Sequence, residues 1–236
     1  MSLALYLLSI FGNLWVYKIA RDNVLVFLGI LVASTALVRY VSGSKKISRK
    51  YIIVSLAIVI FIQLVNFKLI NFTELSNDEV RVRDERLSMY PSENLRLGYY
   101  FEQKREVVAI RRVTDNFLSQ IDPNLYFFAG HPRERLGVVE FEKFPFIFLP
   151  FFLFGAYTAI KNKKYLLFLF LVPVLINSVN RITNETALFP FFAVTLYLGL
   201  VQSNKLTRRK YRKYFYVLFG ILYVLVLFQT IGYEIY

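Results

Sequence analysis

The stretch Asp122–Tyr157 reads DPNLYFFAGHPRERLGVVEFEKFPFIFLPFFLFGAY, and the interpretation of the whole chain starts from it. It carries the single histidine of the sequence, His131, together with a cluster of arginines and glutamates. It then runs without a break into an apolar segment of membrane length. This order predicts a loop domain that meets the bilayer, and we expect any binding or catalytic site to lie at that junction.

The composition requires the bilayer as part of the solvent. Of the 236 residues, 56% are hydrophobic and 18% aromatic, and the mean hydropathy is +0.47. A soluble domain cannot bury that much apolar surface. The net charge of +13 does not form one patch, because basic residues alternate with long apolar runs, so no nucleic acid is expected as a partner. The absence of cysteine excludes disulfides and thiolate metal sites.

Seven apolar segments approach the length that a helix needs to cross hydrocarbon, roughly 17–25 residues. The runs are continuously apolar rather than alternating, which favours helices over a barrel. The sequence therefore predicts an all-α polytopic integral membrane protein with about seven transmembrane helices. The predicted spans are Ser2–Tyr17, Val24–Val41, Tyr51–Ile70, Phe144–Ile160, Tyr165–Val179, Ala187–Gln202 and Tyr214–Gly232.

Three joints between these segments are basic. When Arg39 at the end of the second span is included, the joints after the second, fourth and sixth spans hold five, three and six Lys or Arg residues and no Asp or Glu. The positive-inside rule assigns these joints to the cytoplasm. We therefore expect three transmembrane helices in residues 1–70, an extracytoplasmic loop domain in residues 71–143 and four transmembrane helices in residues 144–236. The N-terminus is then cytoplasmic and the C-terminus extracytoplasmic.

The outer loop domain is expected to be mostly helical. Over about residues 102–121, apolar side chains recur at helical spacing, which predicts an amphipathic helix. The dipeptide Asp122-Pro123 ends it. Such a helix either lies on the membrane surface or packs within its own domain. The apolar positions are Val107, Ile110, Val113, Phe117 and Ile121.

The candidate site is the turn that contains the histidine. His131, Arg133 and Arg135 surround a Gly and a Pro, so their side chains fan out from a turn. Near the lipid headgroups they suit a lipid-linked phosphate or pyrophosphate, through charge-assisted hydrogen bonds. Glu140 and Glu142 are candidates for acid/base chemistry or for holding a divalent cation. The competing interpretation is a salt-bridge cluster within the domain.

A second candidate, Arg181, lies in the short outer turn Asn180–Glu185. This turn should lie on the same side of the membrane as the histidine turn. Arg181 is either a further phosphate contact or a charge that caps the neighbouring span.

The predicted spans contain no Asp or Glu. Ion- and proton-coupled transporters usually need an ionisable group near the middle of the membrane. The sequence therefore disfavours a transporter.

The run FLSQIDPNLYFFAGHPRERLGVVEFEKFPFIFLPFFLFG resembles the last large outer loop and the following span of GT-C membrane glycosyltransferases. The family in question is glycosyltransferase family 39, the bacterial relatives of dolichyl-phosphate-mannose protein mannosyltransferases. The resemblance covers about residues 117–200. It implies a polyprenyl-phosphate-linked sugar as ligand and a role in cell-envelope glycosylation. The matching pieces are Asp122–Gly130, Arg133, Phe144–Gly155, Lys161–Lys164 and Thr183–Leu200.

The chain departs from this family near its beginning. Family members have more spans and a long first outer loop that carries the catalytic acid, whereas here the first outer joint is the short Lys18–Asn23, with Asp22 as its one acid. The chain thus resembles the C-terminal half alone. The expected function is to bind a polyprenyl-phosphate-linked sugar or assist its transfer, without a complete catalytic site. The alternative is a non-enzymatic membrane scaffold or assembly subunit whose outer domain docks a partner membrane protein.

Overall fold

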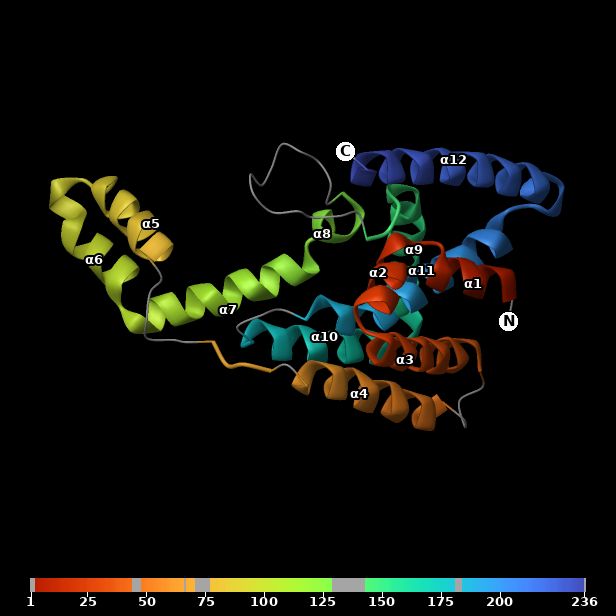
Figure 1. The fold of residues 1–236 in the computed structure, drawn as a ribbon, viewed down its shortest axis with the longest axis horizontal. Coiled ribbons are helices and arrows are strands. Elements are labelled where there is room, and N and C mark those ends of the chain that lie inside the picture. The colour runs from red at the N-terminus through yellow and green to blue at the C-terminus, as the bar shows by residue number, and fades with distance from the viewer. Residues whose placement is uncertain are drawn as a thin grey trace.

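Helices make up most of the part of the chain that the structure describes. The computed structural model describes residues 3–43, 48–65, 67–70, 77–128, 143–180 and 184–235. Within these ranges the one β pairing is an isolated bridge between Leu69 and Asn180. The all-helical class predicted from the sequence is confirmed. The elements, most of them labelled in Figure 1, are α1 (Leu3–Phe11), α2 (Leu14–Asp22), α3 (Val24–Ser42), α4 (Ser48–Leu64), α5 (Asn77–Ser88), η1 (Ser92–Asn94), α6 (Leu95–Gln103), α7 (Arg105–Ile121), α8 (Asn124–Phe127), η2 (Phe146–Phe148), α9 (Leu149–Asn162), α10 (Lys164–Ser178), η3 (Glu185–Leu188), α11 (Phe189–Leu206) and α12 (Arg209–Ile235).

Among the described residues, three helices are long and apolar enough to cross a membrane. They are Val24–Ser42, Glu185–Leu206 and Lys210–Phe228. α1 and α2 meet the same requirement only as a pair, and they are bent by 63°. The number is thus three, or up to four, which is fewer than the seven spans predicted. Three other predicted spans form shorter apolar helices, Lys50–Leu64, Phe146–Asn162 and Tyr165–Ser178.

Local backbone interruptions account for two of the differences from the predicted spans, at the first and the third. The Oδ1 atom of Asn13 accepts a hydrogen bond from the backbone N–H of Val16 at 3.0 Å, so α2 begins anew inside the predicted first span. The chain leaves helical geometry after Leu64, and the backbone N–H of Ile70 donates to the carbonyl of Val179 at 3.1 Å. The predicted spans thus lie largely in helices, but the first is interrupted at Asn13 by capping, and the third ends at Leu64, before a segment that pairs with the end of α10.

α11 forms the centre of the bundle. Every residue from Phe189 to Leu200 is buried. Its principal neighbours are α9 and α3. Gly155 of α9 faces the backbone of α11, and Gly199 of α11 faces the backbone of α9. Small residues at the crossing allow the two helices to pack backbone against backbone, as in membrane helix pairs generally.

Aromatic rings join this bundle to α2 and α8. The ring of Trp15 lies 5.4 Å from that of Phe189, centroid to centroid, and the ring of Tyr126 lies 4.0 Å from that of Phe192. Phe144 is stacked at 6.0 Å on the same Phe192. The cluster packs α2, α8 and the segment before η2 against the N-terminal end of α11.

α5, α6 and α7 form an arm that extends away from the bundle (Figure 1). α7 spans Arg105–Ile121, where the sequence predicts an amphipathic helix over about 102–121. Lys104 has extended backbone angles, so Glu102 belongs to α6. The buried carboxylate of Glu102 accepts two hydrogen bonds from the guanidinium of Arg111, at 2.7 and 3.0 Å. This bidentate pair ties α6 to α7.

The apolar stripe predicted for α7 is only partly buried. Phe117 packs against the core, whereas the side chain of Ile110 is 66% exposed. The base of the helix packs on α10. There the side-chain amide of Asn116 donates to the carbonyls of Ser178 and Asn180, at 3.3 and 3.2 Å. The arm is thus anchored at its base on the end of α10.

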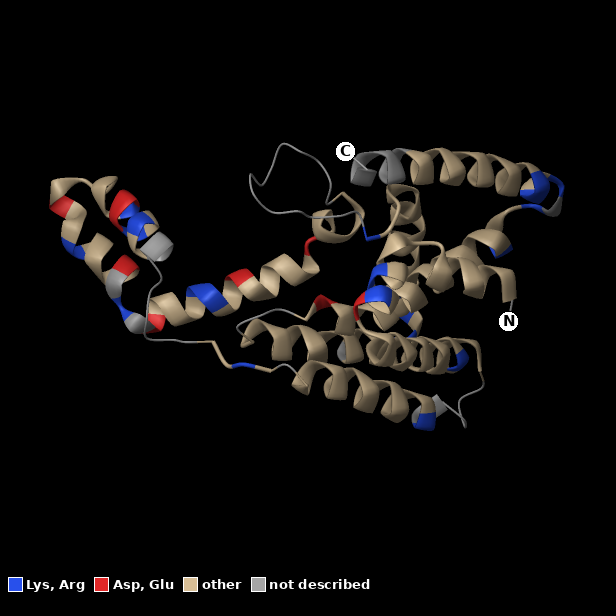
Figure 2. Ribbon diagram, viewed as in Figure 1, with Lys and Arg blue, Asp and Glu red and all other residues tan. Residues whose placement is uncertain are grey.

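Charged side chains differ between the two ends of the molecule. At the end where α3 leads to α4 and α11 leads to α12, the described residues carry Lys and Arg without Asp or Glu (Figure 2). The arm at the opposite end carries both signs (Figure 2). Several helices of this molecule can cross a membrane, and this is the charge distribution that the positive-inside rule uses. The orientation itself stays a prediction.

Candidate functional site

The six site residues predicted from the sequence lie outside the described residues. The structure does describe the residues that flank them, Phe128 and Lys143 around one segment and Asn180 and Asn184 around the other. The site is therefore built from these flanking residues and their neighbours. The predicted residues concerned are His131, Arg133, Arg135, Glu140, Glu142 and Arg181.

Lys143 and Glu185 form an ion pair between the two segments that flank the predicted site residues. The Nζ atom of Lys143 donates a short hydrogen bond to Oε2 of Glu185. The lysine side chain is 7% exposed and the glutamate side chain 27%. The backbone around Lys143 is held as well, since its carbonyl accepts from the N–H of Trp15 at 3.4 Å and the next N–H, of Phe144, donates to Tyr126 at 2.8 Å. A buried ammonium needs a partner such as the Glu185 carboxylate to offset its lost hydration.

Two aromatic rings also lie near this ammonium. Lys143 Nζ lies 4.9 Å from the ring centroid of Tyr126 and 5.5 Å from that of Trp15. Both distances are within the range of a cation–π interaction. The hydroxyl of Tyr126 donates to the carbonyl of Gln120 at 2.9 Å, and burial raises the pKa of this phenol well above its usual value. Tyr126 therefore acts as a neutral ring and a hydrogen-bond donor.

Asparagine side chains fix the turn that carries Glu185. Asn184 donates through its backbone N–H to Oδ1 of Asn177 at 3.2 Å, and its carbonyl accepts from Nδ2 of Asn177 at 3.0 Å. The side-chain amide of Asn184 donates to the carbonyl of Ile62 in α4 at 3.2 Å. These bonds tie α4, the end of α10 and η3 together, so the position of Glu185 follows from the packing of three helices.

A cleft of about 360 Å³ opens beside the ion pair, between α2, α3, α4 and η3. We call it the outer cleft, after the side of the membrane on which the sequence predicts it to lie. Its volume lies within the roughly 300–1,000 Å³ typical of small-molecule sites. Trp15, Ile19, Val26, Ile62 and Val65 give it apolar walls. Its polar lining residues are Lys18, Asp22, Asn23, Lys143, Asn184, Glu185 and Thr186.

The chemistry of the outer cleft is that of a polar recognition site. Two ammonium groups, from Lys18 and Lys143, and two carboxylates, from Asp22 and Glu185, line it together with amide and hydroxyl groups. Ammonium groups bind phosphate oxygens, and carboxylates and amides accept or share hydrogen bonds from sugar hydroxyls. Asp22 is more accessible than Glu185, because its side chain is 58% exposed, and it pairs with Arg21 at 3.7 Å.

Sequence reasoning named Asp22 and Glu185 but did not bring them to one site, and it missed Lys18, Trp15 and Asn184. The one available signal is that Lys18 and Asp22 occupy a single joint with the only tryptophan three residues before it. Within the described ranges, no group of three or more His, Asp or Glu side chains is placed to hold a metal ion. Comparison of the chain with protein-family models, curated proteins and solved structures finds no match.

Proposed function

We propose that this chain is a GT-C-like membrane protein of the cell envelope that binds a polyprenyl-phosphate-linked sugar, or assists its transfer, at the outer cleft. The polar lining would take the phosphate and sugar, and the polyprenyl tail would stay in the bilayer. The proposal rests on the sequence resemblance over about residues 117–200 together with the geometry of the cleft.

The observation that carries this proposal is the Lys143–Glu185 ion pair. Lys143 directly follows the segment with the histidine turn, and Glu185 is the last residue of the turn Asn180–Glu185. Because these two residues meet at the cleft, the residues to which the two candidate segments lead in the sequence lie beside each other there. A single phosphate site fed by both segments is the simplest use of this arrangement. The candidate contacts are His131, Arg133, Arg135 and Arg181, with Glu140 and Glu142 as acid/base groups or ligands of a divalent cation.

The proposal includes seven membrane spans in a positive-inside orientation. The shorter apolar helices, such as Tyr165–Ser178, would cross by local thinning of the bilayer and by use of their flanking residues. The arm would then lie outside the cell and the outer cleft at the outer membrane surface. This arrangement would give the cleft access to a carrier lipid in the outer leaflet.

Assistance in transfer, rather than independent catalysis, fits the short first outer joint. Asp22 is the one carboxylate of that joint, and it lines the outer cleft. A general base must reach the acceptor hydroxyl within hydrogen-bond distance. Asp22 is the residue of this joint that would act as the general base. The acceptor molecule or a partner subunit would supply the remaining groups of the site.

The test measures binding of polyprenyl phosphate to the protein in phosphatidylcholine nanodiscs. We expect Arg133→Ala/Arg135→Ala to abolish binding at an unchanged unfolding temperature. A matched double variant at the basic end, Arg208→Ala/Lys210→Ala, should keep binding, since it removes the same charge far from the cleft. If Arg133→Ala/Arg135→Ala instead lowers the unfolding temperature and keeps binding, the cluster is a structural salt-bridge network and the proposal fails.

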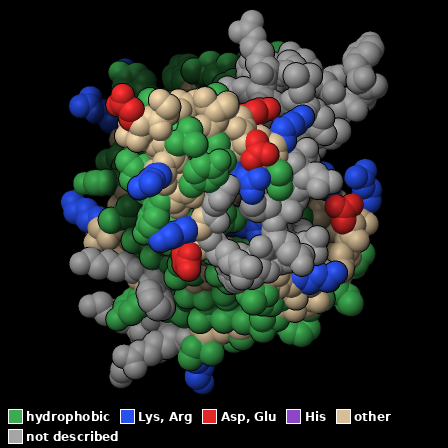
Figure 3. All heavy atoms as spheres, turned by 90° about the vertical axis from the view of Figure 1, so that its left-hand side faces the viewer, with side chains coloured by type: hydrophobic (Ala, Val, Ile, Leu, Met, Phe, Trp, Pro, Cys, Tyr) green, Lys and Arg blue, Asp and Glu red, His purple; other side chains and the backbone are tan. Residues whose placement is uncertain are grey.

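The second candidate function, a scaffold that docks a partner membrane protein, is favoured by the exposed apolar surface of the arm and of α12. Only 6% of the residues in the apolar stretch of Lys210–Phe228, in α12, are buried. On the arm, Leu97 and Phe101 are 54% and 47% exposed, and the face in Figure 3 mixes such apolar side chains with charged ones. Single-cysteine variants Leu218→Cys and Leu225→Cys test this function. Crosslinks to one defined protein, with no binding of polyprenyl phosphate, would favour the scaffold.

A further inference from the structure

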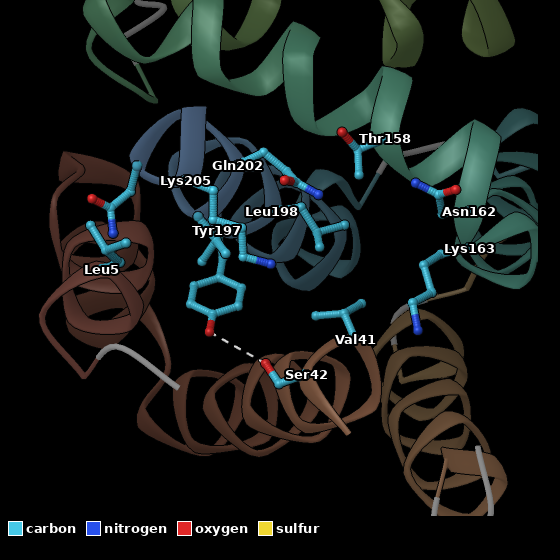
Figure 4. Close-up of a pocket in the computed structure, with 12 residues that line it drawn as sticks. Leu5, Val41, Ser42, Thr158, Asn162, Lys163, Tyr197, Leu198, Gln202 and Lys205 are labelled. Carbon is cyan, nitrogen blue, oxygen red and sulfur yellow. Dashed lines mark hydrogen bonds between the residues drawn. The ribbon is translucent and has the colours of Figure 1, made fainter. Parts of the chain in front are cut away.

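A second cleft, which we call the inner cleft, lies at the basic end of the bundle. It encloses about 480 Å³ between α1, the ends of α3 and α9, and α11 (Figure 4). Tyr197, Gln202 and Lys205 reach it from α11, and Asn162 and Lys163 reach it from the end of α9 (Figure 4). It is separate from the outer cleft, because the two share no lining residue.

The charged residues among those described at the inner cleft are both basic. They are Lys163 and Lys205, and no described carboxylate lines the cleft. Within the described residues, neither lysine forms an ion pair. The Nζ atom of Lys163 lies 5.4 Å from the ring centroid of Tyr40, a cation–π contact that leaves the ammonium protons able to bind an anion. Two ammonium groups around one cleft attract an anion.

Neutral polar groups between the lysines are suited to the oxygens and hydroxyls of a phosphate. The hydroxyls of Ser42 and Tyr197 lie 3.3 Å apart at one wall (Figure 4). Oδ1 of Asn204, which also lines the cleft, is buried and has no hydrogen-bond partner among the described residues. An unpaired buried acceptor costs free energy until a donor reaches it. A protonated phosphate or a headgroup hydroxyl is such a donor.

The walls of the inner cleft combine these polar groups with apolar ones, Leu198 and Val201 among them. The cleft also lies where helices that can cross a membrane end, since α3 ends at Ser42 and α11 at Leu206. Anionic lipid headgroups concentrate at such a boundary and attract basic residues there. An amphiphilic anion therefore matches both the charge and the walls.

We propose that the inner cleft binds a phosphate anion between Lys163 and Lys205, either the phosphodiester of an anionic lipid headgroup or a free phosphate. This site is independent of the function proposed for the outer cleft. The ammonium groups hold the phosphate oxygens, the amides of Asn162 and Gln202 donate to them, and Asn204 accepts from a hydroxyl of the ligand.

Lys205 also lies in the last turn of α11, where its positive charge interacts favourably with the negative end of the helix dipole. Stability alone therefore does not separate a binding role from a capping role, and binding is the decisive readout. The experiment uses the full chain in neutral detergent with two probes, short-chain phosphatidylglycerol and inorganic phosphate. Dissociation constants are measured for the wild type and for Lys163→Gln/Lys205→Gln. The matched control is Lys161→Gln/Lys210→Gln, which removes two exposed lysines from the same end outside the cleft.

We expect phosphatidylglycerol to bind the wild type and to bind Lys163→Gln/Lys205→Gln at least tenfold more weakly, while the control keeps wild-type affinity. Lys163→Arg/Lys205→Arg should retain binding, which shows that the cleft is intact. Binding of phosphatidylglycerol alone assigns a lipid headgroup, and comparable binding of inorganic phosphate assigns a free anion. The proposal is overturned if neither probe binds the wild type, or if the control pair weakens binding as much as the cleft pair.

Discussion

Gly155 of α9 and Gly199 of α11 each lie against the backbone of the other helix. A Cβ atom built on Gly155 would be 1.9 Å from the carbonyl oxygen of Thr195, and one built on Gly199 would be 1.8 Å from the carbonyl oxygen of Phe151. Backbone atoms cannot move aside as a flexible side chain can. The two glycines therefore set how closely the central helices of the bundle approach.

We predict that Gly155→Ala and Gly199→Ala each destabilise the protein. Overpacking of a tight contact typically costs about 1–3 kcal/mol, and a backbone contact has little room to relax. The control is Gly220→Ala in α12, where a Cβ would meet no atom within 4 Å. Thermal unfolding in detergent should show a lower midpoint for the first two variants and an unchanged or higher one for the control. Equal midpoints for all three would mean that the crossing is not tight.

The Lys143–Glu185 pair should behave as a coupled unit. Lys143→Met leaves Glu185 without its cation, and loss of one partner of a buried pair costs up to about 3–5 kcal/mol. The effect should be smaller here, because the glutamate side chain is 27% exposed to solvent. Lys143→Met/Glu185→Gln should recover part of the loss, measured as a positive coupling in a double-mutant cycle of unfolding free energies. Strict additivity of the two single changes would contradict the pairing.

Acid should loosen the arm at the α6–α7 turn. The hydrogen bonds from Arg111 lower the pKa of Glu102 below its ordinary value of 4.5. A carboxyl with a depressed pKa contributes its full stability above that ordinary value and loses it as the pH falls through the lower folded-state pKa. Limited proteolysis of the arm should therefore accelerate below about pH 4.

The same experiment on Glu102→Gln should give proteolysis that is faster at neutral pH and less dependent on acid. Asp84→Asn serves as the control, because Asp84 pairs with Arg83 on the exposed surface of α5. Exposed pairs contribute little, about 0–1 kcal/mol. A pH profile that is identical for Glu102→Gln and the wild type would place the acid sensitivity elsewhere in the arm.

Trp15 should report occupancy of the outer cleft. It is the only tryptophan of the chain, it is 4% exposed, and it lines that cleft. Binding of polyprenyl phosphate there should change its fluorescence intensity or emission maximum in proportion to occupancy. Inorganic phosphate or phosphatidylglycerol at the inner cleft should leave the emission unchanged. A response to the inner-cleft probes alone would reverse the assignment of the two sites.

Orientation is open to cysteine labelling, because the chain has no cysteine of its own. Ser92→Cys lies on the arm and Lys210→Cys at the basic end, and both side chains are exposed. A membrane-impermeant maleimide applied to intact cells should label Ser92→Cys and spare Lys210→Cys, which should react only after permeabilisation. The reverse pattern would contradict the positive-inside assignment.

Local properties of the chain account for what the sequence predicted well. Continuous apolar runs specify helices that can enter a bilayer, because every backbone polar group must be satisfied within the segment. The end of α7 was also predictable, because a residue before proline is driven out of helical geometry, and Asp122 has extended backbone angles in front of Pro123. The runs of Lys and Arg at the joints can likewise be located from the sequence without knowledge of the tertiary structure.

Helix lengths were harder to predict, because hydropathy does not register capping or pairing across the bundle. Asn13 interrupts the first predicted span through a hydrogen bond to Val16 only three residues away. The fourth helix stops at Leu64, and the chain beyond it pairs with the segment after α10, more than a hundred residues later. Hydropathy averaged along the sequence records the apolar content of both places, but it does not record the polar groups that bond where each helix ends.

The sequence alone thus determined that this is an all-helical chain with membrane-length apolar segments, and where its candidate phosphate-binding residues fall along it. Only the tertiary structure brought Lys143 to Glu185, 42 residues away, and opened the outer cleft beside them with Lys18, Trp15 and Asn184. The reason is physical. Apolarity and backbone preference are local, whereas the lining of a cleft depends on which helices meet, and that is decided by contacts such as those of Gly155 with α11 and of Asn184 with Ile62, 122 residues apart.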